Sequence, residues 1–215
     1  FKTPHRTEGT RMPVLAIETA TQQMGLAVHD GERVVSSYEL LAESPQTAEL
    51  PDAVRRVLAG AGTTLGRLET IVVDIGPGSF TGLRIGLAFA KSLALATGKR
   101  LVGVSSLDVL AAQLPFSARA VCPVLDAKRK NVYAALYHVE RETPVRRTDY
   151  LLSPIEEVLQ AIGEPTIFLG DGCLLYRDQI TARCPEGQFA PPEMWWPKAG
   201  TLARLGWARA EAGPA

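Results

Sequence analysis

The sequence is poor in the residues from which metal sites and disulfide frameworks are built. Its 215 residues include three cysteines and three histidines. The cysteines form no C-x-x-C pair, and no two histidines have the spacing of metal ligands. We therefore expect neither a disulfide framework nor a cysteine zinc site, and a reducing cytoplasm is the compartment that fits best.

The chain also lacks an excess of charge and a long apolar segment. Lys and Arg together number 23, as do Asp and Glu, so the net charge is zero. A protein that binds nucleic acid on its own usually carries an excess of basic charge, and this balance argues against that class. No apolar run reaches the ~18 residues of a membrane helix. We expect a soluble chain with no membrane segment.

Hydrophobic residues make up 46% of the chain, which is enough for a sizeable core. The polar, aperiodic residues 1–11 are expected to form a disordered leader outside the fold. The remainder is expected to form two domains of similar type, residues 12–105 and residues 106–215.

The first half predicts a mixed α/β sheet. Asp30-Gly31 between two apolar runs favours a tight hairpin, and a further strand precedes it, so three antiparallel strands are expected. The following strands alternate with helices, which indicates parallel pairing. The expected elements are strands at 14–17, 24–29, 33–38, 71–73 and 101–104 and helices at 50–61 and 80–96.

The second half repeats this pattern more weakly. Residues 185–198 contain four prolines and are expected to be loop. The expected elements are strands at 121–125, 131–137 and 166–169 and helices at 154–162 and 201–212.

A Gly-rich segment at residues 76–86, GPGSFTGLRIG, joins a strand to a helix. Ser79 is well placed as the N-cap, and backbone N–H groups at such a junction can bind an anion. The alternative is a tight turn that needs glycine and allows a close helix contact. The segment matches neither G-x-G-x-x-G nor the phosphate-binding P-loop. The residues assigned to this turn are Gly76, Gly78, Ser79, Gly82 and Gly86.

The helix at 80–96 carries apolar residues on two sides. A helix that lies on a sheet needs one apolar face, so a second apolar face should have a cover of its own. That cover could come from the other half of the chain, and we favour a partner helix.

Three segments together resemble one family. They are residues 15–21 (LAIETAT), residues 76–86 (GPGSFTGLRIG) and residues 124–128 (VLDAK) ahead of Val132-Tyr133. They are similar to the bacterial TsaB (YeaZ) family, and the resemblance runs from Met12 to about Ala212. It implies an actin-like ASKHA (ribonuclease H-like) fold of two related α/β domains.

The resemblance also implies a role. Family members are non-catalytic partners of TsaD, which attaches threonylcarbamoyl to N6 of the adenosine next to the anticodon of tRNA; the small ATPase TsaE joins the assembly. The resemblance implies that the chain binds TsaD through its first two helices. When TsaD is absent, we expect a homodimer through the same helices. tRNA contact is expected only within the complex. The implied interface residues are Leu50, Val54, Val57, Leu58, Phe80, Leu83, Arg84, Leu87 and Phe89.

No catalytic or metal-binding residue is expected. TsaD-type metal sites use paired histidines on the first helix, where this chain has Gln46 and no histidine. We expect no cofactor; the weak candidates for a remnant nucleotide site are Thr19, Asp126, Gly170 and Gly172. Asp126 and Gly170-Asp171-Gly172 keep an actin-like ATPase or phosphotransferase open as the alternative. A metallopeptidase would rest on paralogy alone.

Overall fold

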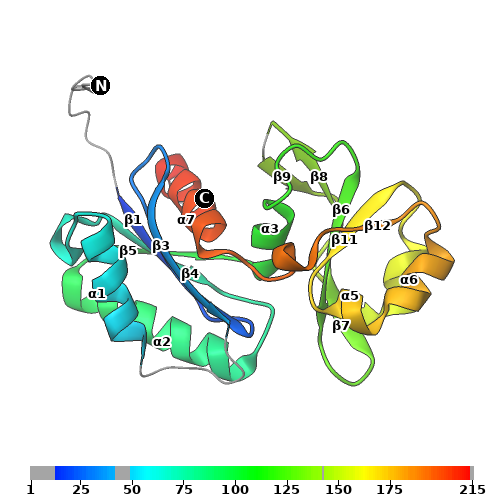
Figure 1. Cartoon of the computed structure of the whole chain (residues 1–215), viewed down its shortest axis with the longest axis horizontal. Coiled ribbons are helices and arrows are strands. Elements are labelled where there is room, and N and C mark those ends of the chain that lie inside the picture. Colours follow the sequence, from blue (N-terminus) through cyan, green and yellow to red (C-terminus); the bar gives the residue numbers. More distant parts are fainter. Residues whose placement is uncertain (1–12, 42–48, 142, 214–215) are drawn as a thin grey trace.

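The computed structural model describes residues 13–41, 49–141 and 143–213. Its helices and strands form two lobes, each built around its own sheet (Figure 1). The predicted leader at residues 1–11 and the position of Gln46 lie outside the described residues.

The first sheet has the strand order β3-β2-β1-β4-β5. Its strands are β1 (Val14–Glu18), β2 (Gln23–His29), β3 (Val34–Leu41), β4 (Thr70–Asp74) and β5 (Arg100–Val104). The first three are antiparallel, and β4 and β5 run parallel to β1. Asp30 closes the β2–β3 turn by accepting the N–H groups of Glu32 and Arg33. The predicted meander and parallel strands are confirmed.

Both faces of this sheet are covered, which explains why every residue of β1 is buried. In Figure 1, α1 (Leu50–Gly60) and α2 (Phe80–Thr97) cover one face, and α7 (Ala199–Ala212) covers the other. Leu15 and Ile17 of β1 face the α1–α2 side, while Val14 and Ala16 face α7. The short 3-10 helix η2 (Leu65–Arg67) precedes β4.

The second lobe holds a mixed sheet of order β10-β7-β6-β11-β12, with β8 paired to β6 and β9. Its strands are β6 (Ala120–Asp126), β7 (Asn131–Ala134), β8 (Tyr137–Glu140), β9 (Thr143–Arg146), β10 (Leu151–Pro154), β11 (Thr166–Leu169) and β12 (Gln188–Phe189). Its helices are α3 (Ser106–Ala111), α4 (Ile155–Gln160), α5 (Gly172–Leu175), α6 (Arg177–Arg183) and the 3-10 helix η3 (Pro192–Met194).

Two expectations for the second half need correction. The single strand predicted at 131–137 is two strands, β7 and β8. The first pairs with β10 and β6, and after a break at residues 135–136 the second pairs with β6 and β9. The last helix was expected in the second domain, but α7 packs on β1, β2 and β4 of the first sheet. Gly206 makes this close contact possible, since a Cβ there would lie 2.2 Å from a methyl carbon of Val72. The division at residue 105 therefore does not hold for α7.

Among the helices of the described ranges, none combines the length and apolar character needed to cross a membrane.

Candidate partner-binding site

The Gly-rich segment leads from the end of β4 into α2, and hydrogen bonds within the chain hold it. Ser79 is the N-cap of α2, as predicted, and its Oγ accepts from the N–H of Gly82 at 3.3 Å. The Ser79 N–H donates to the carbonyl of Ala20 at 2.6 Å. The Gly76 N–H donates to Asp74 Oδ1 at 2.6 Å. These N–H groups are engaged inside the fold, which favours a structural turn over an anion-binding loop.

The glycines of this segment allow α2 to lie directly on the loop after β1. A Cβ at Gly78 would lie 2.1 Å from the carbonyl oxygen of Ala20, and one at Gly82 would lie 2.0 Å from that of Thr19. A Cβ at Gly86 would lie 2.0 Å from Thr19 Oγ1. Real Cβ atoms do not approach oxygen so closely. The close helix contact predicted for this segment is therefore made with residues 19–20, which we call the seat of α2.

The outward side of α2 is exposed and partly apolar. Phe80 and Leu95 are 73% and 87% exposed, although both are large hydrophobic residues. The guanidinium of Arg84 lies over the Phe80 ring at 5.3 Å. The outward row has the spacing i, i+4, i+8, i+11 and i+15, which keeps it on one side of a helix. Its members are Phe80, Arg84, Ala88, Lys91 and Leu95.

The expected interface residues divide into two groups. On α1, Leu50, Val54, Val57 and Leu58 are between 1% and 6% exposed and belong to the core of the first lobe, so placing them at an interface was wrong. The outward side of α1 is largely polar, with Asp52, Arg55 and Arg56.

On α2, Phe80 and Arg84 are exposed, while Leu83, Leu87 and Phe89 are half-buried. Leu87 and Phe89 pack against the core of their own lobe, together with Ile85 and Leu93. Much of the second apolar face of α2 is therefore covered by this chain. Leu95, the most exposed large hydrophobic residue of the helix, was not among the interface residues expected from the sequence.

A pair of buried acids at the ends of β1 and β4 was not predicted from the sequence. Glu18 ends β1 and Asp74 ends β4, and the two are 0% and 1% exposed. The signal that could have found them is topological: each acid ends a buried strand, and these strands are parallel neighbours. Burial raises the pKa of both carboxyl groups, and the Asp74 carboxylate raises the pKa of Glu18 further.

The weak nucleotide-site candidates fall into two separate places. Thr19 belongs to the seat of α2, where its Oγ1 donates to the Gly82 carbonyl at 2.9 Å. Asp126, Gly170 and Gly172 meet where β6 and β11 end, since the Asp126 N–H donates to Asp171 Oδ1 at 2.9 Å. A Cβ at Gly170 would lie 2.3 Å from the Val124 carbonyl oxygen, so this glycine serves a close backbone contact.

The carboxylate of Asp126 is itself engaged. Its Oδ1 accepts from the N–H of Lys128 at 2.9 Å, and its Oδ2 is paired with Lys128 Nζ at 2.6 Å. Burial raises the pKa of Asp171, the other acid of this group. Within the residues that the structure describes, no group of three or more His, Cys, Asp or Glu side chains could hold a metal ion.

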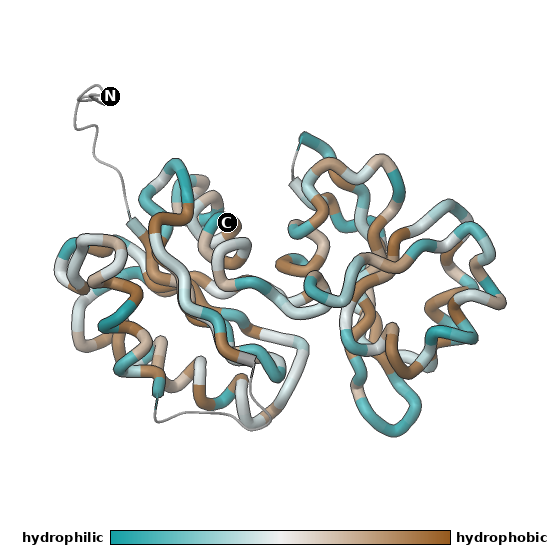
Figure 2. The backbone as a smooth tube through the Cα atoms, viewed as in Figure 1, coloured by the Kyte–Doolittle hydropathy of each residue, from teal (hydrophilic) through white to brown (hydrophobic). Residues whose placement is uncertain are grey.

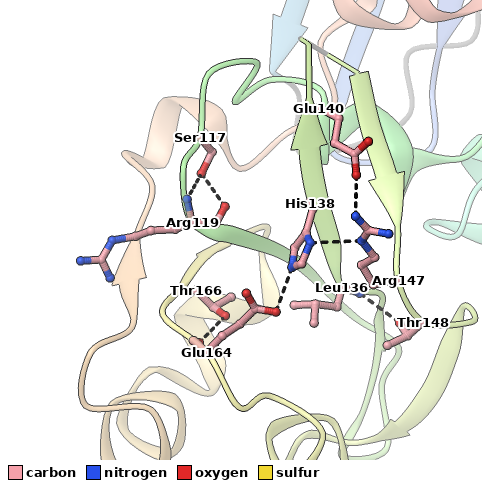
Figure 3. A network of polar contacts seen from close by, with 9 residues as sticks. All are labelled: Ser117, Arg119, Leu136, His138, Glu140, Arg147, Thr148, Glu164 and Thr166. Carbon is pink, nitrogen blue, oxygen red and sulfur yellow. Dashed lines mark hydrogen bonds and ion pairs between the residues drawn. The ribbon is translucent and has the colours of Figure 1, made fainter.

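A polar network surrounds His138, a residue type that often serves as a general acid or base (Figure 3). Both ring nitrogens of His138 are occupied by partners within this network. Arg147 Nε donates to Nδ1 at 3.1 Å, so Nε2 carries the proton and faces Glu164 at 2.9 Å. Arg147 also pairs with Glu140. A general base needs a ring nitrogen free for a nucleophile or substrate. The network therefore ties β8, β9 and the start of β11 together.

Among the described residues, Lys128, Arg129 and Lys130 lie apart from Arg146 and Arg147, so these basic residues do not form one patch. The registers of β7 and β8 on β6 place the β6–β7 turn, with Lys128, Arg129 and Lys130, at one end of β6 and the β8–β9 turn at the other (Figure 1). Figure 2 shows the β6–β7 turn as a hydrophilic tip. Arg146 lies over the Tyr150 ring at 3.8 Å, and Arg147 is bound in the His138 network.

Comparison with known proteins places this architecture in a family. Residues 41–169 match the family model described as TsaD, tRNA N6-adenosine threonylcarbamoyltransferase. The chain is 32% identical over 172 residues to the tRNA threonylcarbamoyladenosine biosynthesis protein TsaB of Bacillus subtilis, covering 79% of this chain and 75% of that protein. The chain belongs to the TsaB family. The Escherichia coli TsaB protein is also 32% identical, over 78% of this chain and 74% of its own length.

Solved structures confirm the fold that the resemblance implied. YeaZ from Pseudomonas aeruginosa has a TM-score of 0.76 and 25% identity, covering 93% of this chain and 94% of that chain. A ROK hexokinase from Thermus thermophilus has a TM-score of 0.53 at 13% identity, covering 94% of this chain and all of its own, which shows the fold alone. The actin-like ASKHA fold class is thus confirmed.

Proposed function

We propose that the chain is a non-catalytic subunit of the assembly that makes threonylcarbamoyladenosine in tRNA, and that it acts by binding TsaD through the outward face of α2. The family relatives are named for this pathway. The observation that carries the binding mode is the row with Phe80 and Leu95, which exposes large apolar side chains on a helix seated by glycine contacts. Because tRNA is the substrate, the proposed place of action is the cytoplasm.

Exposed apolar surface on a fixed helix is typical of a docking face. Large hydrophobic residues that remain solvent-exposed usually mark an interaction site when they gather on one element. Arg84 and Lys91 add positive charge between the apolar residues, which favours a partner helix with apolar and acidic side chains. Without TsaD, two copies of the chain are expected to pair through this same face. TsaE is proposed to join only through the larger assembly.

The proposal that the chain is non-catalytic is supported by the contacts of its candidate catalytic and nucleotide-binding side chains, which are engaged within the chain. Both oxygens of Asp126 are bound to Lys128, and Thr19 supports α2. His138 has both ring nitrogens occupied. The proposal therefore assigns transfer chemistry to TsaD, and any contact of the Lys128–Lys130 turn with tRNA to the complete assembly.

The actin-like ATPase alternative gives a direct prediction. In calorimetry with ATP and Mg²⁺, the chain alone should show no stoichiometric binding, because Lys128 already neutralises Asp126 and Asp171 is hydrogen-bonded to the backbone. Micromolar binding with a stoichiometry near one would support the alternative instead. In that event Asp126→Asn and Asp171→Asn would show whether the end of β6 and β11 holds the nucleotide.

A binding measurement tests the proposed function itself. TsaD immobilised on a sensor should bind the wild-type chain, with a single class of sites. Absence of binding by a correctly folded chain to its cognate TsaD would overturn the proposal.

A further inference from the structure

The buried acid pair ends the two strands, β1 and β4, that lead into the seat of α2 and into the Gly-rich turn. Glu18 follows Ile17, which pairs with Val73 across the parallel strands, and Asp74 follows Val73. The two side chains therefore leave neighbouring strands side by side on one face of the sheet. The two carboxyl groups interact, since, besides burial, Asp74 raises the pKa of Glu18.

Each carboxyl group has one oxygen bound and one without a donor. Glu18 Oε1 accepts from the N–H of Ala20 at 2.8 Å. Asp74 Oδ1 accepts from the N–H of Gly76 at 2.6 Å and from Ser106 Oγ at 2.7 Å. Within the described part of the chain, Glu18 Oε2 and Asp74 Oδ2 have no hydrogen-bond donor.

Two neighbouring anions at this depth would repel each other strongly, and their free oxygens would lack hydrogen bonds. A proton on one carboxyl group removes both problems, because a protonated carboxyl donates to the other carboxylate. Glu18 is the better proton carrier, since burial and the neighbouring Asp74 raise its pKa well above the ordinary value, while Asp74 Oδ1 accepts both an N–H and a hydroxyl group.

The surrounding charges do not relieve the pair. Asp108 on α3 raises the pKa of Asp74 further, and its own carboxylate is bound by Arg209 of α7 and by the hydroxyls of Tyr137 and Tyr150. On the α2 side, Arg84 and Lys91 are solvent-exposed. At the N-cap of α7, Lys198 Nζ donates to Gln23 and Glu39.

We propose that Glu18 and Asp74 share one proton and that this protonated pair positions α2 for partner binding. Glu18 holds Ala20, whose carbonyl accepts the N–H of the α2 N-cap Ser79 at 2.6 Å. Asp74 holds Gly76 at the start of the same turn and Ser106 at the start of α3. The two acids are positioning residues, and the inference about binding rests on the proposed function.

The shared proton has a pH signature with a definite sign. In the proposed pair, folded Glu18 keeps its proton above the pH at which it ionises in the unfolded chain, near the ordinary pKa of about 4.3. Above the unfolded-state pKa, the unfolded state binds fewer protons than the folded state. The contribution of this proton to the free energy of unfolding is therefore fully present below the unfolded-state pKa and is lost as the pH rises through the folded-state pKa. The unfolding constant should rise by up to ~10-fold per pH unit from this source.

Urea unfolding of the full chain from about pH 5 to about pH 9 measures this signature. Glu18→Gln keeps a donor to Asp74 but cannot titrate, so its profile should lack the rise and should separate from that of the wild type as the pH increases. Glu193→Gln, at an exposed glutamate, is the matched control and should follow the wild type. Parallel wild-type and Glu18→Gln profiles would overturn the shared proton.

Binding to TsaD tests the positioning role. Glu18→Leu, measured where it is fully folded, should bind TsaD more than ~10-fold more weakly, while Glu18→Gln should restore affinity to within ~3-fold of the wild type. Should Glu18→Leu not fold, Asp74→Ala with Asp74→Asn as its conservative counterpart gives the same comparison. Equal affinity for the disruptive and the conservative variant would overturn the positioning role. If the wild type itself does not bind, the proposed function fails, while the unfolding profiles still test the proton.

Discussion

Replacing Leu95 with Asp should abolish the interaction with TsaD without unfolding the chain. Leu95 is 87% exposed, so a charged residue there costs the free chain little. On a docked helix face, the same charge would lose its water and displace an apolar contact. Loss of such a contact is worth ~3 kcal/mol, which corresponds to more than ~100-fold in affinity. Surface plasmon resonance with immobilised TsaD measures this change.

The control for this substitution is Leu174→Asp. Leu174 is 65% exposed and lies on α5 in the second lobe, so it receives the same change of side chain away from α2. It should bind TsaD like the wild type. Phe89→Asp is not a suitable test, because Phe89 packs on the core of its own lobe. Undiminished affinity of Leu95→Asp, or an equal loss in Leu174→Asp, would contradict the assignment of the face.

Replacing Gly82 with Ala should destabilise the chain by ~3 kcal/mol, although the same change at an ordinary helix position stabilises by up to ~1 kcal/mol. The new Cβ would lie 2.0 Å from the carbonyl oxygen of Thr19, a backbone atom that cannot rotate away. Either α2 or the loop after β1 must shift. Thermal unfolding should show a midpoint lower by roughly 10 °C.

Gly163→Ala is the matched control for this prediction. A Cβ at Gly163 would meet no atom within 4 Å, and the residue does not have a positive φ. Its unfolding midpoint should stay within about 2 °C of the wild type. A Gly82→Ala chain as stable as the wild type would show that the glycine is not required for the contact with Thr19, and the structural account of the Gly-rich segment would be wrong.

Much of the first lobe could be predicted from local sequence signals. Asp30-Gly31 identified the β2–β3 turn, the apolar spacing of residues 50–61 identified α1, and Ser79 identified the start of α2. Less of the second lobe could be predicted. Helices α5 and α6 have only 4 and 7 residues and strands β8, β9 and β10 have 4 each, which is too short for a clear hydrophobic periodicity.

The failures share one physical cause: the sequence shows which side of a helix is apolar but not what covers it. Leu50, Val54 and Val57 have the pattern of a binding face, and the chain's own sheet covers them. The same limit hid the return of α7 to the first sheet. Glu18 and Asp74 were hidden for a related reason, since their pairing exists only once β1 and β4 are neighbours.

Reconstitution of tRNA modification tests the central claim most directly. TsaD, TsaE, the threonylcarbamoyl-adenylate donor and tRNA are incubated with no addition, with the wild-type chain, with Leu95→Asp, or with the double variant Asp126→Ala/Asp171→Ala, and the modified nucleoside is counted. We predict that modification requires the chain, is lost with Leu95→Asp and survives in the double variant. An equal yield of modified nucleoside with and without the chain would contradict a subunit that acts through α2. So would a yield that is lost in the Asp126→Ala/Asp171→Ala variant but kept with Leu95→Asp.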